Sequence, residues 1–203
     1  MSNVNAPNGF QFYGKMEGAA PTVGATTRLI AAANTTPIGY GDPVVSLSTG
    51  YIDRATAGVT QIAGIFYGCE YFNSAVGRKV WSHSWPGSSN TGDILAYLDT
   101  DPNSMYVAQA SLAPVVFADI DSNVQFVIGT PATEAAGGFS TSSILSGSPL
   151  DTNTLPFRVV GLLSQYAPGG ANSGVNGTDD ASNYNRVIVR ANYWDRTSLV
   201  GIA

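Results

Sequence analysis

Short apolar runs separated by turn-forming residues dominate the chain from residue 26 onward. The first three runs span residues 28–32, 43–47 and 60–67, with Gly-Asp-Pro at 41–43 and Ser-Thr-Gly at 48–50 as the breaks. Runs of this length, bounded by Gly, Pro, Asp and Ser, are typical of β-strands. This region therefore predicts three strands of a β-rich scaffold.

The same pattern of short apolar runs separated by turn-forming residues continues to the end of the chain. Five further short runs follow, at 78–85, 94–98, 105–110, 114–118 and 124–128, and two stronger ones, at 157–166 and 184–194, close the chain. In the last run every second residue is apolar, as in a half-buried strand. The pattern predicts an all-β fold, a single β-barrel or β-sandwich.

The first 25 residues show no periodicity that would form a local core. They contain Phe10, Phe12 and Tyr13 among several Gly and Pro residues, which predicts an extended N-terminal arm over residues 1–25. Aromatic side chains on such an arm need a receiving surface, either the body of the same chain or a partner. We expect Phe10, Phe12 and Tyr13 to be the partner-binding residues, and residues 26–203 to form the β-domain, with long surface loops at 129–155 and 167–183.

Charge, hydrophobicity and cysteine content limit the classes of partner and the cellular compartments that fit this chain. The net charge is −5, and the nine basic residues are scattered along the chain, which argues against a nucleic-acid partner. The apolar runs are too short to cross a membrane, and the N-terminus lacks the basic and apolar regions of a standard secretory signal. The single cysteine, Cys69, excludes an intrachain disulfide and suits a reducing compartment such as a bacterial cytoplasm.

The titratable residues predict no catalytic, metal or cofactor site. His83 is the only histidine, and its neighbours Ser82 and Ser84 point to the opposite face of a strand. The carboxylate pairs Asp99/Asp101 and Asp119/Asp121 have a spacing that could hold Ca²⁺, but their surroundings favour a turn-forming role. A hydrolase with a dispersed carboxylate site stays open as one rival function.

Four aromatic residues near two apolar runs offer a second rival. Trp81, Trp85, Tyr193 and Trp194 could form a sugar-stacking platform, which would make the protein a carbohydrate-binding or adhesin-like module. Burial of these rings in the core is the competing interpretation, and the alternation of the strands favours it.

Seven segments, taken in order, resemble a family of virion proteins. They are Gly9-Phe10, residues 28–30, Gly-Asp-Pro-Val-Val at 41–45, Ile-Ala-Gly-Ile-Phe-Tyr-Gly at 62–68, Met-Tyr-Val-Ala-Gln at 105–109, Phe-Arg-Val-Val-Gly-Leu-Leu at 157–163, and Arg-Val-Ile-Val-Arg at 186–190. Their order and spacing are similar to those of the capsid decoration, or cement, proteins of tailed bacteriophages, which are encoded beside the major capsid protein. The chain departs from that pattern in its polar loop at 129–155 and in Lys-Val-Trp-Ser-His-Ser-Trp-Pro-Gly at 79–87.

The resemblance implies a non-enzymatic structural protein without a cofactor. It implies binding to the outer surface of the phage head, where the protein stabilises the capsid by bridging subunits. The implied partners are the major capsid protein and further copies of the chain, as a dimer or trimer. The implied location is the capsid exterior of the virion, after synthesis in the host bacterial cytoplasm.

Overall fold

A computed structural model describes residues 3–16, 25–88, 90–131, 133–147, 151–163, 179–198 and 201. The all-β prediction is confirmed: strands and two short 3₁₀ turns make up the regular structure of this part of the chain. The strands are β1 (Gln11–Lys15), β2 (Thr26–Ile30), β3 (Pro43–Ser46), β4 (Ile52–Arg54), β5 (Gly64–Asn73), β6 (Arg78–Ser82), β7 (Ile94–Asp99), β8 (Ser104–Gln109), β9 (Asn123–Val124), β10 (Phe126–Val127), β11 (Ser143–Ile144), β12 (Phe157–Leu162) and β13 (Arg186–Ala191). The 3₁₀ turns are η1 (Phe117–Asp119) and η2 (Glu134–Ala136). Within the described ranges, no helix has the length and apolarity needed to span a bilayer.

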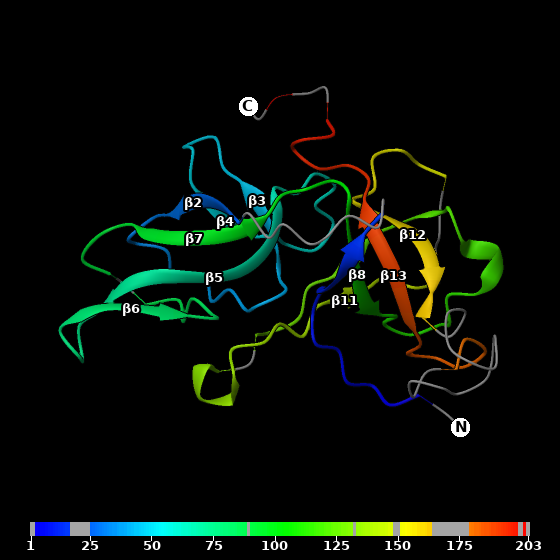
Figure 1. Cartoon of the computed structure of the whole chain (residues 1–203), viewed down its shortest axis with the longest axis horizontal. Helices are drawn as coiled ribbons and strands as arrows, with labels where there is room; N and C mark the ends of the chain where they lie inside the picture. Colours follow the sequence, from blue (N-terminus) through cyan, green and yellow to red (C-terminus); the bar gives the residue numbers. More distant parts are fainter. Residues whose placement is uncertain are drawn as a thin grey trace.

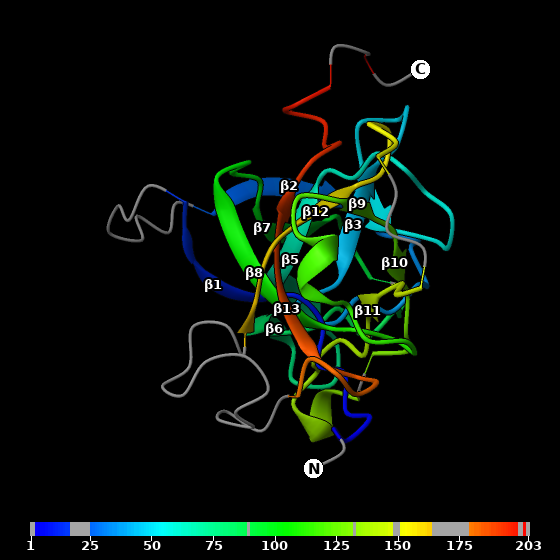
Figure 2. The same ribbon diagram turned by 90° about the vertical axis from the view of Figure 1, so that its right-hand side faces the viewer.

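Two antiparallel sheets lie side by side along the long axis of the molecule (Figure 1). Sheet A has the order β1-β8-β13-β12-β9, and sheet B has the order β2-β7-β5-β3-β4, with β6 also paired to β5. Strands β10 and β11 form a separate pair. Figure 2 looks from the end that carries sheet A, with the strands of sheet B behind it. The sheets are not closed into a barrel, so the arrangement is sandwich-like.

Strand β5 separates two hydrophobic cores. Ile65 belongs to the core shared with sheet A, whereas its neighbour Phe66 belongs to a core between sheet B and the loops that carry Ile38 and Trp85. A strand buried on both faces needs apolar residues at successive positions. This explains why residues 62–67 form a nearly continuous apolar run rather than an alternating one.

Part of the N-terminal segment, which the sequence predicts to be an extended arm over residues 1–25, pairs with the β-body. Strand β1 pairs antiparallel with β8, from Gln11 opposite Val107 to Lys15 opposite Ser104. The receiving surface is therefore the body of the same chain, one of the two possibilities that the sequence left open. Residues 17–24 of the predicted arm lie outside the described residues.

Two local predictions need correction. The run at 114–118 forms no strand, because Pro114 lacks an amide donor and Asp119 accepts a bond from the Val116 amide at the start of η1. The predicted surface loop 129–155 is partly buried, since it contributes β11 and the buried Ser140 and Ser142. Most of the second predicted loop, residues 167–178, falls outside the described residues.

Candidate functional site

The three aromatic residues expected to bind a partner have different environments. Phe10 has 0% exposure and stacks on Phe157, with ring centroids 4.4 Å apart. Phe12 is half-buried and makes an edge contact with Tyr106 at 6.5 Å. Tyr13 is 45% exposed. Phe10 is thus a core residue of this fold and offers no surface to a partner, whereas a partner role for Tyr13 and Phe12 stays a prediction.

The four aromatic residues of the proposed sugar platform do not share a surface. Trp85 is 1% exposed and Trp194 is 0% exposed, and they belong to different cores. The Trp194 indole donates to the Pro156 carbonyl oxygen at 3.0 Å, which satisfies its buried N–H. Only Trp81 presents more than half of its surface, at 54%. Burial in the core, the competing interpretation, holds for Trp85 and Trp194.

A different group of rings is exposed, and we call Trp81, His83 and Phe139 the aromatic patch. The Trp81 and His83 rings meet edge to face at 4.5 Å, and Phe139 stacks on His83 at 6.4 Å. Gly68, in a β-bulge at φ 151°, makes room for Trp81: a Cβ on Gly68 would lie 3.0 Å from the indole. The patch therefore depends on Gly68 of β5, on strand β6, which carries Trp81, and on the loop that carries Phe139.

The Asp99 and Asp101 carboxylates form turns, as their surroundings predicted. Asp99 Oδ1 accepts from the Asp101 amide at 3.0 Å, and Asp101 Oδ1 accepts from the Asn103 amide at 2.9 Å. These bonds shape the connection from β7 in sheet B to β8 in sheet A. Among the described residues, His, Cys, Asp and Glu side chains do not gather in groups of three that could hold a metal ion.

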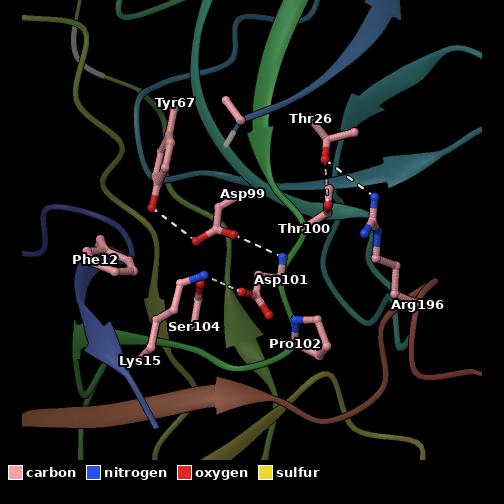
Figure 3. Close-up of a pocket in the computed structure, with 11 residues that line it drawn as sticks. Phe12, Lys15, Thr26, Tyr67, Asp99, Thr100, Asp101, Pro102, Ser104 and Arg196 are labelled. Carbon is pink, nitrogen blue, oxygen red and sulfur yellow. Dashed lines mark hydrogen bonds and ion pairs between the residues drawn. The ribbon is translucent and has the colours of Figure 1, made fainter. Parts of the chain in front are cut away.

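The same connection borders a cavity of about 370 Å³ between the two sheets. Its lining combines four charged side chains with hydroxyl and apolar groups: Phe12, Lys15, Ala25, Thr26, Tyr67, Asp99, Thr100, Asp101, Pro102, Ser104 and Arg196. Figure 3 shows Tyr67 reaching toward Asp99, and Lys15 toward Asp101. We call this space the inter-sheet cavity.

Ion pairing and hydrogen bonds order one wall of the inter-sheet cavity. Lys15 Nζ lies 2.6 Å from Asp101 Oδ2, and this bond lowers the pKa of Asp101 and raises that of Lys15. The Tyr67 hydroxyl donates to Asp99 Oδ2 at 3.3 Å. Burial, followed by the Asp99 charge, raises the pKa of Tyr67 well above its usual range, so this phenol stays protonated at neutral pH.

The opposite rim of the inter-sheet cavity carries a positive charge. Thr26 Oγ1 and Thr100 Oγ1 lie 2.9 Å apart, and the Arg196 guanidinium reaches Thr26 Oγ1 at 3.4 Å. Arg196 is exposed, and its charge also lowers the pKa of Asp101. The guanidinium therefore keeps most of its donors available at the opening.

Sequence reasoning missed both features because their parts are far apart along the chain. Lys15 and Arg196 approach the cavity from opposite ends of the sequence, and Phe139 reaches the aromatic patch from a polar loop. The one local signal was the Asp99/Asp101 spacing, which correctly marked a turn. Comparisons of the chain with protein-family models, with curated proteins and with solved structures find no match.

Proposed function

We propose that this chain is a non-enzymatic structural protein of a tailed-phage virion, which binds the outer surface of the head and bridges neighbouring copies of the major capsid protein. The proposal rests first on the order of segments that resembles the cement proteins. It predicts a location on the capsid exterior and self-association as a dimer or trimer.

The aromatic patch is the structural observation that carries this proposal. Trp81 and Phe139 expose 54% and 43% of their surface, and His83 between them is also exposed. Adjoining aromatic rings that face solvent favour a contact with another macromolecule. Aromatic side chains are also enriched in the centres of protein interfaces.

The strands and side chains beneath the aromatic patch are closely packed, which suits a rigid binding surface. Trp81 lies on β6, which pairs over five positions with the long strand β5. Beneath these strands Tyr71 packs edge-on against the buried Trp85, with ring centroids 5.2 Å apart. A rigid platform loses little conformational entropy on binding, which favours affinity per contact.

A low fraction of charged residues and multivalent binding also suit a protein that binds a capsid lattice. Only 11% of the residues of the chain are charged, so its contacts should depend less on ionic strength than those of a highly charged protein. A protein that makes several modest contacts, repeated over an icosahedral lattice, gains avidity without any single strong site.

Cosedimentation with empty, expanded heads tests the proposal. The heads are assembled from the major capsid protein of the genome that encodes this chain. We expect the wild type to sediment with the heads and Trp81→Ala to lose at least about tenfold in affinity, as for a central aromatic contact. Phe117→Ala, which removes a ring that is 66% exposed on η1, is the matched control and should bind like the wild type. Wild-type protein that stays in the supernatant would refute the proposal.

Removing residues 2–20 is not a useful test of partner binding. The deletion takes away strand β1 and the buried Phe10, so the body itself would lose stability. Tyr13→Ala tests the same segment without this defect, because Tyr13 is exposed on β1. A decrease in head binding would support the predicted partner role of Tyr13.

The carbohydrate-binding alternative now depends on Trp81 alone among the three tryptophans. An exposed indole beside His83 is a surface on which a sugar ring could stack. A glycan array with wild type and Trp81→Ala separates the two functions. Binding to glycans that Trp81→Ala abolishes, together with no binding to heads, would favour the adhesin-like module.

A further inference from the structure

The inter-sheet cavity contains a buried hydroxyl without a partner. Ser104 is 1% exposed and lines the cavity, and its Oγ makes no hydrogen bond within the usual distance; the buried Tyr106 hydroxyl next to it makes none either. Buried hydroxyl groups almost always find a partner, because leaving one unpaired costs free energy. The exceptions need an explanation, and a bound ligand that supplies the missing hydrogen bond is one.

From this hydroxyl and the groups around it, we propose that the inter-sheet cavity binds a neutral polyhydroxylated ligand of the size of one monosaccharide. The site is separate from the aromatic patch, so this inference goes beyond the proposed role on the phage head. It holds or fails independently of capsid binding.

Charge balance favours a neutral ligand. Four charged side chains line the cavity, two of each sign: Lys15, Arg196, Asp99 and Asp101. Their formal charges cancel, so a ligand with a net charge gains no general attraction. Lys15 Nζ, 2.6 Å from Asp101 Oδ2, already occupies the place that a metal cation would take beside that carboxylate.

Hydrogen-bonding capacity favours hydroxyl groups. Each oxygen of Asp101 accepts one bond, from Lys15 or from the Asn103 amide, and can accept another. The Lys15 ammonium and the Arg196 guanidinium each have spare donors beyond the bonds they make. A hydroxyl group both donates and accepts, so it matches a cavity that offers both free donors and free acceptors.

Size and shape agree with one sugar ring. A cavity of about 370 Å³ lies at the lower end of the roughly 300–1,000 Å³ typical of small-molecule sites. Phe12, Tyr67 and Pro102 contribute apolar surface to the lining. Such surface suits the C–H face of a sugar, while the polar groups suit its hydroxyls.

Titration of ¹⁵N-labelled protein with a panel of monosaccharides tests the proposal. The neutral probes are glucose, galactose, mannose, rhamnose and N-acetylglucosamine, and the charged probes are glucuronate, glucosamine and calcium chloride. We expect at least one neutral sugar to give saturable shifts of the backbone amide signals of Asp101 and Asn103, with no comparable response to the charged probes. These amides are informative because both bond to carboxylates at the cavity.

Two variants connect the response to the cavity. Ser104→Ala removes a hydroxyl that has no partner in the free protein, so the fold should persist while the affinity falls about three- to tenfold. Arg196→Met changes an exposed side chain and should weaken binding by a similar factor, which keeps the test valid if Ser104→Ala fails to fold. Ser111→Ala alters a half-buried hydroxyl outside the cavity lining and should leave the affinity unchanged.

Any of three results would overturn the inference. The first is no saturable shift with any neutral sugar, and the second is a response to the charged probes only. The third is binding that Ser104→Ala and Arg196→Met both leave at the wild-type affinity, which would place the sugar elsewhere on the protein.

Discussion

Two groups of buried polar side chains differ in how completely their hydrogen bonds are made. Asp42, at 0% exposure, accepts from the hydroxyls of Ser140 at 2.5 Å and Ser142 at 2.7 Å, and from the Gly39 amide at 2.8 Å. At the inter-sheet cavity, the equally buried Ser104 hydroxyl has no partner. A saturated polar group fixes the chain segments that meet there, whereas an unsaturated one leaves capacity for a ligand.

The saturated group joins three segments that are distant in sequence. The Gly9 amide donates to the Ser142 carbonyl at 3.2 Å, and the Phe10 amide donates to the Gly41 carbonyl at 3.0 Å. Gly41 has φ +87°, and a Cβ there would lie 3.0 Å from the Phe10 nitrogen. The Gly-Asp-Pro turn at 41–43 is therefore a junction that ties the N-terminal segment and the loop at 140–142 to sheet B. We call it the Asp42 junction.

The largest effect is expected for the aromatic ring next to the Asp42 junction. Phe10→Ala should lower the free energy of unfolding by about 3–5 kcal/mol, because it empties a fully buried site stacked on Phe157. Urea denaturation measures the change. Tyr13→Ala, on the same segment but 45% exposed, should stay within about 0.5 kcal/mol of the wild type. If Phe10→Ala, like Tyr13→Ala, left the free energy of unfolding unchanged, residues 3–16 would not belong to the cooperative fold.

Asp42→Asn tests the saturated site itself. The substitution replaces one acceptor oxygen with an NH₂ group, which would face groups that donate hydrogen bonds to Asp42 in the wild type. The free energy of unfolding should therefore fall by about 1–3 kcal/mol. Hydrogen exchange should also accelerate at the Ser142 amide, which donates to the Ser140 hydroxyl at 2.9 Å. Asp53→Asn is the control, because Asp53 is only half-buried on β4. A loss confined to Asp53→Asn would contradict the structural role of Asp42.

The strands of the body could be predicted from the sequence because their signal is local. The runs that became β2, β3, β7 and β8 each carry an apolar pattern bounded by turn residues, and the turns at Asp99 and Asp101 follow from their neighbours. Strand β4, only three residues long, has too little pattern to stand out. Local periodicity thus identifies an element when the element is long enough to repeat it.

The position of Phe10 and the inter-sheet cavity could not be predicted in this way. Strand β1 is stabilised by β8, whose Val107 pairs with Gln11, so its own sequence carries no sign of the pairing. The cavity likewise brings Lys15 and Arg196 together across nearly the whole chain. Such contacts depend on the register between sheets, and no pattern within a single segment encodes it.

Tyr106→Phe tests a second buried hydroxyl group near the inter-sheet cavity whose hydrogen bonds are not made. The Tyr106 hydroxyl is buried near Asp99 and Ser104 but makes no hydrogen bond within the usual distance, so its removal should leave the free energy of unfolding unchanged or raise it by up to about 1 kcal/mol. Tyr67→Phe makes the same chemical change but breaks the bond to Asp99, and should cost about 0.5–1.5 kcal/mol. Thermal and urea unfolding of both variants should show a loss of stability for Tyr67→Phe alone. A clear loss for Tyr106→Phe would mean that this hydroxyl is paired in solution.

The pH dependence of stability distinguishes Asp42 from Asp101, and the effect expected is the smallest of those considered. Burial raises the pKa of Asp42, outweighing the hydrogen bonds from Ser140, Gly39 and Ser142 that lower it. A group whose pKa is raised on folding contributes stability that is present below the ordinary carboxyl range, near pH 4, and is lost as the pH rises through its folded pKa. Asp101 acts in the opposite direction, because the bond from Lys15 lowers its pKa, and its contribution is lost as the pH falls.

Subtracting the stability profile of Asp42→Asn from that of the wild type isolates the contribution of Asp42, since Asp101 is present in both proteins. The difference in the free energy of unfolding should decrease as the pH rises above about 4. Urea denaturation at a series of pH values measures it. A difference that increases with pH instead would mean that the three hydrogen bonds stabilise the Asp42 carboxylate more than burial destabilises it, and the Asp42 junction would then be held by a charge rather than by a buried acid.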